Sequence, residues 1–233
     1  MGQKKLKRFA EIKTFTNVLE YPNDMPGQWR HFFKNDNPLV LELACGRGEY
    51  TVGLSKLYPA KNFLGVDIKG NRIYIGAKKC LDEKYTNAAF LRTQIEMLPT
   101  YFNVSEVDEI WITFPDPQLR TSHAKKRLTH PRFLRLYQQL LKPDGVIHLK
   151  TDSPKLYGFT KKVIQLYGLT TMDDCDDVYS KSDKQELKIK THYEGLDIAQ
   201  SNKIYYLQFK LPAIIASIDE QLQDELKLTE TEQ

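Results

Sequence analysis

Acidic side chains stand at the ends of apolar segments in this sequence, where they could face a bound ligand. Glu42 lies within the apolar run 38–43, directly before a turn that contains Gly46 and Gly48. Asp67 ends the next apolar run, at about the 20-residue separation from the glycines at which an acid can bond ribose hydroxyls. Glycine also lets the backbone approach a ligand closely. These residues predict a nucleotide site at the turn.

Two classes of nucleotide compete for this turn. The dinucleotide fingerprint GxGxxG requires a glycine at position 51, where the chain has Thr51, so a pyrophosphate cradle is disfavoured. A nucleotide sulfonium needs no phosphate cradle, only close backbone and acids that face a cation and a ribose. Glu42 suits the cation and Asp67 suits the ribose, which favours the sulfonium.

A third acid, Asp116, is enclosed by Pro115 and Pro117 at the end of another apolar run. Two prolines exclude a helix and a central strand position, so this carboxylate must lie on a rigid corner, where folds tend to place functional side chains. The corner leads into a cationic segment: Arg120, His123, Lys125, Lys126 and Arg127. Such a segment suits nucleic-acid phosphates. The alternatives are that Asp116 only caps the following turn and that the cationic segment is solvated surface.

Strand-like and helix-like segments alternate along the chain and must position these acids. Their β-branched and aromatic residues predict strands over 38–43, 62–67, 88–92, 107–114 and 145–150, with a late strand over 203–211. Helices are predicted over 49–58, 68–85, 131–142 and 155–168. Residues 170–202 are expected to be loop with some strand. The alternation predicts an α/β fold, with a mostly parallel twisted sheet and helices on both faces.

The composition fits one large domain. Of 233 residues, 41% are hydrophobic and 27% are charged, which is typical of a soluble globular protein. No apolar run reaches the roughly 18 residues of a membrane span, and no apolar segment follows the basic start as in a secretory signal. We therefore expect a cytoplasmic protein without a membrane anchor. Three separated cysteines and no histidine pair at metal-ligand spacing indicate no metal site.

Charge is distributed unevenly. The net charge is +4, but residues 213–233 hold six acids and one lysine, so the rest of the chain carries +9. A basic body weakly favours a polyanionic partner. We expect a basic N-terminal segment over 1–37 that packs on or near the main domain, the main domain over 38–212, and an acidic C-terminal tail over 213–233. The tail is expected to be a surface helix that frays.

The strand acid, the glycine turn and the acid of the second strand together resemble class I S-adenosylmethionine-dependent methyltransferases. Four further motifs, FPDP at 114–117, KKRLTHPRFL at 125–134, KTD at 150–152 and TxYE at 191–194, resemble the bacterial tRNA (guanine-N7-)-methyltransferase family in the correct order. The resemblance covers most of 38–210. It implies a Rossmann-like methyltransferase fold with S-adenosyl-L-methionine as cofactor. The implied substrate is tRNA, methylated at N7 of a guanine in the variable loop, at tRNA position 46.

The resemblance also implies roles for residues at matching positions. The implied cofactor-binding residues are Glu42, Gly46, Gly48, Asp67, Gln94 and Asp116. The implied substrate-binding residues are Arg120, Asp152, Thr191, Tyr193 and Glu194. Asp116 is the implied catalytic residue, because its motif lies between cofactor and acceptor.

Some positions depart from the family pattern. Ala44 replaces a common glycine, and alanine adopts most of the same conformations unless φ is positive. Gln94 stands where Asp or Asn is usual, although an amide can still hydrogen-bond there. Gln118 and Leu119 replace a common Trp-Pro, and Gly195 follows the TxYE motif, which leaves the shape of the acceptor pocket open.

Two other functions stay open at this point. One is an amino-group methyltransferase that acts on adenine or on a protein side chain, although such adenine enzymes usually carry Asp/Asn-Pro-Pro-aromatic at this strand end. The other is a non-catalytic RNA-binding subunit with the same fold. The sequence does not distinguish monomer from homodimer, nor does it indicate which tRNAs are preferred.

Overall fold

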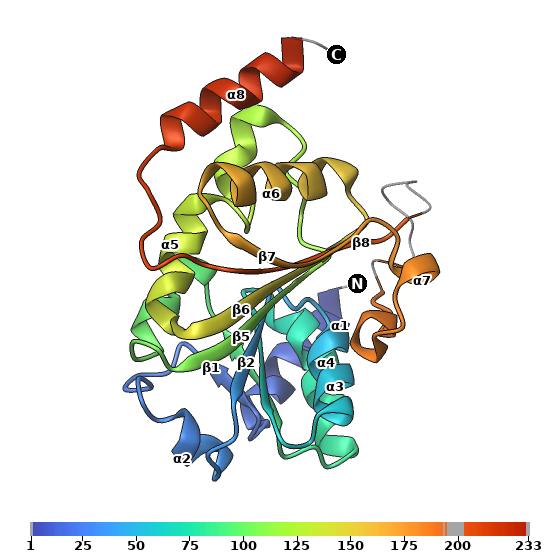
Figure 1. Cartoon of the computed structure of the whole chain (residues 1–233). Helices are drawn as coiled ribbons and strands as arrows, with labels where there is room; N and C mark the ends of the chain where they lie inside the picture. The colour runs from blue at the N-terminus through green and yellow to red at the C-terminus, as the bar shows by residue number, and fades with distance from the viewer. Residues whose placement is uncertain (1, 193, 195–202, 232–233) are drawn as a thin grey trace.

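Residues 2–192, 194 and 203–231 are described by a computed structural model of the chain, and their strands form one sheet of eight with helices on both faces (Figure 1). The strand order is β1-β4-β3-β2-β5-β6-β8-β7. Neighbouring strands run parallel from β1 to β6, whereas β8 is antiparallel to both β6 and β7. The predicted α/β fold with a mostly parallel sheet is therefore confirmed.

The elements have the following bounds. The strands are β1 (Val18–Glu20), β2 (Leu39–Leu43), β3 (Asn62–Asp67), β4 (Ala88–Arg92), β5 (Val107–Thr113), β6 (Leu141–Thr151), β7 (Thr170–Cys175) and β8 (Tyr205–Lys210). The α-helices are α1 (Gly2–Glu11), α2 (Trp29–Phe33), α3 (Glu49–Leu57), α4 (Gly70–Asp82), α5 (Pro131–Leu140), α6 (Pro154–Leu166), α7 (Val178–Lys181) and α8 (Asp219–Thr231). The 3₁₀ helices are η1 (Ile12–Thr14), η2 (Ile95–Thr100), η3 (Thr121–Lys126) and η4 (Gln185–Lys188).

The first four predicted strands form within one residue of their expected bounds, but the junction of α5 and β6 differs. The helix ends at Leu140, not at 142, and the strand begins at Leu141, not at 145. Leu141 has extended backbone and pairs with Val107 of β5. Pro143, two residues further on, has no N–H with which to continue a helix. Sheet pairing thus takes over residues that have helical spacing in the sequence.

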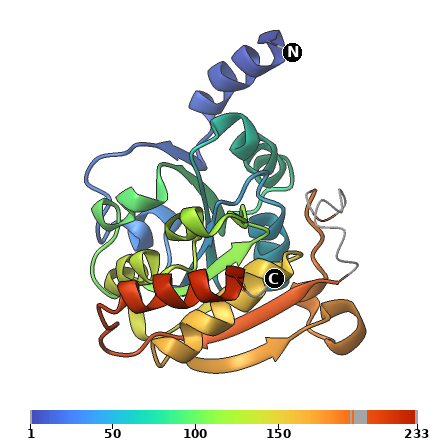
Figure 2. The same cartoon turned by 90° about the horizontal axis from the view of Figure 1, so that it is seen from above.

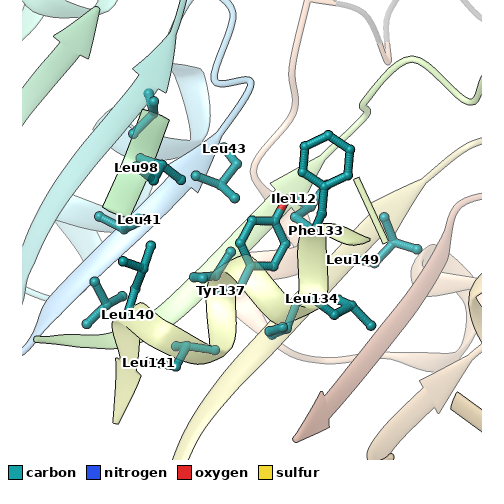
Figure 3. Packing of buried hydrophobic residues seen from close by; sticks show 14 of the residues in the cluster. Leu41, Leu43, Leu98, Ile112, Phe133, Leu134, Tyr137, Leu140, Leu141 and Leu149 are labelled. Atoms are coloured by element: carbon teal, nitrogen blue, oxygen red, sulfur yellow. The ribbon is translucent and has the colours of Figure 1, made fainter. Parts of the chain in front are cut away.

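Alternate residues of β2 face opposite helical layers, as strand geometry requires. Leu41 and Leu43 pack in one core with side chains of α5, including Leu134 and Tyr137 (Figure 3). Val40 packs on the other face with residues of α3. Helices α3 and α4 cover that face, while α5 and α6 cover the first (Figure 1). Because both faces are covered, every residue of β2 is buried, including the acid Glu42.

The segments 1–37 and 213–233 contribute residues to the sheet and the core. Strand β1 pairs with β4, Trp29 of α2 is buried in the core, and α1 projects from the body (Figure 2). The expectation that the acidic tail frays is wrong for the first turns of α8, which lie along α6 (Figure 2). Leu222 is 1% exposed and packs in the main core, and the Asp219 carboxylate bonds Arg135 of α5 at 2.6 Å.

Among the described residues, no helix has both the length and the apolarity that crossing a bilayer requires.

The docking of α8 can be tested with two leucines of the same helix. Leu222→Ala should lower the free energy of unfolding by about 2–5 kcal/mol, because the substitution leaves a cavity in the core. Leu228→Ala, at a side chain that is 64% exposed, is the matched control and should change it by about 0.5 kcal/mol or less. Urea unfolding measures both. Equal small effects would mean that α8 does not dock.

Candidate active site

A cavity of about 790 Å³ opens at the carboxyl ends of β2, β3, β5 and β6. The chain order reverses here, because β3 lies on one side of β2 and β5 on the other, and open α/β sheets bind ligands at such switch points. The predicted site residues that line the cavity are Glu42, Gly46, Asp67, Asp116, Asp152 and Thr191. The fold therefore brings residues from distant motifs to one cavity.

Glu42 is 3% exposed, yet its carboxylate lines the cavity. Its Oε2 accepts hydrogen bonds from the backbone N–H and the hydroxyl of Thr51, at 2.7 and 2.5 Å, and its Oε1 accepts one from the Thr113 hydroxyl at 2.8 Å. Burial raises the pKa of Glu42 from 4.5 to about 7, although these hydrogen bonds oppose the rise. A carboxyl group with a raised pKa in a cleft marks a candidate functional site. A bound cation would favour its ionised form.

Thr51 and Thr113 are functional residues that the sequence analysis missed. In the sequence, Thr51 only shows that the third glycine of the dinucleotide fingerprint is missing. In the structure, its side chain and its N–H donate hydrogen bonds to Glu42. Because Glu42 occupies this N–H near the start of α3, a carboxylate sits where a dinucleotide site would place phosphate. The structure thus supports the sequence-based preference for a sulfonium over a pyrophosphate.

The turn after β2 has left-handed backbone at three positions, with φ of +55° at Ala44, +57° at Gly46 and +73° at Gly48. Because alanine tolerates a positive φ less well than glycine does, the backbone at Ala44 carries a strain of about 1–2 kcal/mol. A Cβ at Gly48 would lie 2.4 Å from Cε1 of Phe90. Gly48 is thus required for packing of the turn against β4, and it is not among the residues that line the cavity.

Asp67 lies at the end of β3 and is 8% exposed. Its Oδ2 accepts a hydrogen bond from Gly46 N at 2.9 Å, and its Oδ1 accepts one from Lys69 N at 2.8 Å. Asp67 therefore joins the glycine turn to the start of α4 and also lines the cavity. A carboxylate has lone pairs beyond these two bonds with which it can accept from ribose hydroxyls.

The FPDP corner after β5 is strained at both ends. Phe114 has φ of +46° and Gln118 has φ of +47°, a conformation that bulky residues rarely adopt. The Asp116 side chain is exposed, accepts a hydrogen bond from Gln118 N at 3.0 Å and lines the cavity. Asp116 therefore caps its turn, as the alternative expected, and also faces the cavity. Strain of this kind is common at functional sites.

Arg127 corrects the prediction that the whole cationic segment faces RNA. Its side chain is 4% exposed, and its guanidinium donates to the carbonyls of Pro117 and Gln118 at 3.0–3.2 Å. It also lies 4.4 Å from the ring centroid of Phe159. Arg127 thus holds the backbone of the FPDP corner. Arg120, Lys125 and Lys126 are exposed and can still meet phosphates.

Three other predicted site residues, Gln94, Arg120 and Glu194, are not among the described residues that line the cavity. Gln94 and Arg120 are exposed, at the starts of η2 and η3 respectively. Glu194 bonds Lys150 at 3.2 Å, and Tyr193 lies outside the described residues.

Three basic residues that the sequence analysis did not single out also line the cavity: Lys69, Arg72 and Lys155. Nothing in the sequence separates them from other surface cations. Among the residues that the structure describes, no group of three or more His, Cys, Asp or Glu could hold a metal ion.

Comparisons with known proteins agree with this geometry. Residues 36–207 match a family model described as "Putative methyltransferase". The chain is 46% identical over 222 residues to a tRNA (guanine-N(7)-)-methyltransferase of Bacteroides thetaiotaomicron, covering 91% of this chain and 87% of that one. It is 49% identical over 213 residues to the protein of the same name from Porphyromonas gingivalis, covering 86% of each.

Solved structures resemble the fold. The 16S rRNA methyltransferase KamB superposes with a TM-score of 0.61 at 14% identity, covering 80% of this chain and 94% of that one. A variant of the 16S rRNA (adenine(1408)-N(1))-methyltransferase from Catenulisporales acidiphilia, solved with its cosubstrate SAM, gives a TM-score of 0.54 at 13% identity, covering 80% and 92%. At these identities the likeness shows the Rossmann-like methyltransferase fold alone.

The raised pKa of Glu42 makes stability depend on pH in a defined direction. In the unfolded chain this group loses its proton near its ordinary pKa of 4.5, but in the folded protein only near 7. Between these pH values the folded state therefore holds more protons than the unfolded state. As the pH rises through this range, the titration of Glu42 should lower the free energy of unfolding of the ligand-free protein by about 3 kcal/mol. Urea unfolding of the wild type and of Glu42→Gln at pH 5, 6, 7 and 8 checks this. The difference between their unfolding free energies should change across this range, and a constant difference would contradict the assignment.

Proposed function

Because this chain belongs to the tRNA (guanine-N(7)-)-methyltransferase family, we propose how its residues carry out the family reaction and where on tRNA it acts. The reaction transfers a methyl group from S-adenosylmethionine to N7 of a guanine in tRNA. The proposed target is a guanine of the variable loop. The observation that carries the assignment of roles is the convergence of Glu42, Asp67 and Asp116 on one cavity.

The residues of the cavity suit this cofactor. Its volume of about 790 Å³ is in the range of small-molecule sites. S-adenosylmethionine is cationic, and the acids that line the cavity at β2 and β3 suit a cation. We assign Glu42 to the charged end of the cofactor and Asp67 to its ribose. Gln94 lies outside the described cavity lining, at the start of η2, and we assign it to the adenine edge of a cofactor that extends beyond that lining. When bound, the cofactor supplies a methyl group that its positive sulfur activates for transfer.

The acceptor side of the cavity is formed by Asp116, Asp152 and Thr191. Guanine N7 carries a lone pair and no proton, so no residue has to act as a base. The two carboxylates can accept hydrogen bonds from the N1–H and N2–H₂ edge of guanine, a donor pair that adenine lacks. Asp116 also faces the positive charge as it passes to the purine, which lowers the barrier electrostatically. The work of the site is alignment and charge stabilisation.

Exposed cations extend the site toward the RNA. Arg120 lies directly after the FPDP corner, with Lys125 and Lys126 in the same exposed segment, and Lys155 lies in the cavity wall. We assign these residues to tRNA phosphates. We further propose that 38–212 is the catalytic region, flanked by the segments 1–37 and 213–233, and that the protein works in the cytoplasm.

The position on tRNA is tested with labelled cofactor and unmodified tRNA transcripts. The label should appear as 7-methylguanine, and it should be lost from a transcript whose variable-loop guanine is replaced by adenine. A transcript with a guanine replaced in another loop is the matched control and should stay labelled. Label that persists after the variable-loop change would place the target elsewhere, and label on another base would contradict the assigned chemistry.

Substitutions should separate chemistry from binding. Asp116→Ala should lower the rate of methyl transfer about 100-fold while tRNA affinity stays close to that of the wild type, because the acid acts mainly on developing charge. Asp116→Asn can keep the hydrogen bond to Gln118 N and should be almost as slow, since it lacks the charge. Single-turnover rates and filter binding measure these effects.

Arg120→Ala should show the opposite pattern, with weaker tRNA binding and little change in the rate of methyl transfer. The slope of the logarithm of the tRNA binding constant against the logarithm of salt concentration should fall in magnitude by about 1. Arg30→Ala, at an exposed arginine that pairs with Asp36, serves as the control. If Asp116→Ala and Arg120→Ala change the same quantity, the division of roles is wrong.

A further inference from the structure

A fully buried lysine lies behind the acceptor side of the cavity and has no role in the reaction described above. Lys150, the first residue of the KTD motif, is 0% exposed, although lysine is almost never fully buried unless it is paired. Its ammonium donates to the Ile189 carbonyl at 3.0 Å and to Oε2 of Glu194 at 3.2 Å. It therefore ties β6 to the late segment that carries the TxYE motif.

The Glu194 carboxylate is directed into the protein. Its Oε2 also accepts from Thr191 N at 3.4 Å, while Glu194 N donates to the Thr191 hydroxyl at 3.1 Å. This reciprocal pair is the arrangement of a capping box, in which Thr and Glu three residues apart satisfy each other's N–H. The other oxygen of Glu194 accepts from the hydroxyl of Tyr179. The side chain of Glu194 is 7% exposed, whereas Thr191 lines the cavity.

The same ammonium also contacts the corner that holds Asp116. Lys150 Nζ lies 5.2 Å from the ring centroid of Phe114, the strained residue before Pro115, and 5.3 Å from that of Tyr50. Aromatic faces attract cations at this distance. The two chain segments that supply Asp116 and Thr191 to the cavity thus meet at one buried charge.

We propose that Lys150 is a positioning residue for methyl transfer, whose ammonium holds the late segment through Ile189 and Glu194 and the FPDP corner through Phe114. Thr191 and Asp116 then keep their places without any contact between Lys150 and the substrate. Glu194 belongs to this support and acts through Thr191. The proposal rests on the proposed function of the cavity.

Hydrogen–deuterium exchange of the ligand-free protein tests the support itself. Lys150→Met keeps a chain of similar length and removes the ammonium, so the amides of Thr191 and Glu194 should exchange about 10-fold faster or more. Lys188→Met is the matched control, because Lys188 is an exposed lysine of the neighbouring η4, 3.9 Å from the exposed carboxylate of Asp183. Its exchange pattern should match the wild type. Unchanged protection of these amides in Lys150→Met would overturn the proposal. If Lys150→Met does not fold, the milder substitution Glu194→Gln is used for the same measurement.

Kinetics test the consequence for the reaction. With tRNA and cofactor both saturating, Lys150→Met should lower kcat about 100-fold, because a small displacement of positioned groups is costly, while the Kd of S-adenosylmethionine stays within about twofold. Glu194→Gln should also be slow, and the double variant should be no slower than the slower single one. If the two substitutions lower kcat independently, so that their effects multiply in the double variant, Glu194 contacts the base directly. That result would overturn the assignment of Glu194 to the support around Lys150.

The two levels of the proposal fail in different ways. A wild-type protein that does not methylate guanine N7 in tRNA contradicts the proposed function, while exchange in the ligand-free protein still decides the role of Lys150. An active wild type with an equally active Lys150→Met overturns only the role of Lys150.

The pH profile gives a further signature. Burial lowers the pKa of Lys150 to about 8, although the pairing with Glu194 opposes this. Lys190 and Glu194 act on its charge from the late segment. The rings of Tyr50 in α3 and Tyr179 in α7 lie 5.3 and 5.6 Å from its ammonium, and Tyr206 of β8 is its cross-strand partner. Burial raises the pKa of all three phenols, so they stay neutral through this range. Wild-type kcat should therefore fall as the pH rises past about 8, and Lys150→Met should lack this decline. The same alkaline decline in both proteins would overturn the proposal.

Discussion

The buried carboxylate of Glu42 is the constraint on which the cavity depends. Its three hydrogen bonds join β2 to the start of α3 through Thr51 and to the end of β5 through Thr113. An unpaired carboxylate at this depth would be very costly, so these partners are required for the acid to stay in the sheet. The carboxylate of Glu42 also occupies the N–H of Thr51, near the start of α3, which would otherwise attract phosphate. One set of bonds thus stabilises the strand junction and holds the carboxylate that we assign to the cationic cofactor.

Two cations perform the corresponding task on the acceptor side. Arg127 holds the carbonyls of the FPDP corner, and Lys150 holds the late segment. Both side chains are almost completely buried, so neither is available to RNA phosphates. A cluster of basic residues in the sequence therefore combines structural cations with surface cations. The proposed attraction for tRNA phosphates rests on the exposed members Arg120, Lys125 and Lys126.

Three of the eight described non-glycine residues with positive φ lie in or next to the cavity lining. Ala44, Phe114 and Gln118 all have positive φ, at a cost of about 1–3 kcal/mol each. Such residues persist only where surrounding contacts determine them, and at Phe114 and Gln118 those contacts are visible. Arg127 and Asp116 hold Gln118 through its carbonyl and its N–H, and the ring of Phe114 lies against the ammonium of Lys150. The strained corner and the buried charges therefore form one arrangement.

The sequence by itself determined the elements and the motif residues, because periodicity and turn chemistry are local properties. It predicted the strands 62–67 and 88–92 to the residue and a site shared by Glu42 and Asp67, and the family resemblance implied that Asp116 belongs to the same site. All three acids line one cavity. Only the tertiary structure decided which polar side chains are enclosed. The bonds of Thr51 and Thr113 to Glu42, the burial of Arg127 and Lys150, and the docking of Leu222 all join residues distant in the chain or depend on how those residues pack. No local pattern encodes such contacts, because burial is a property of the assembled layers.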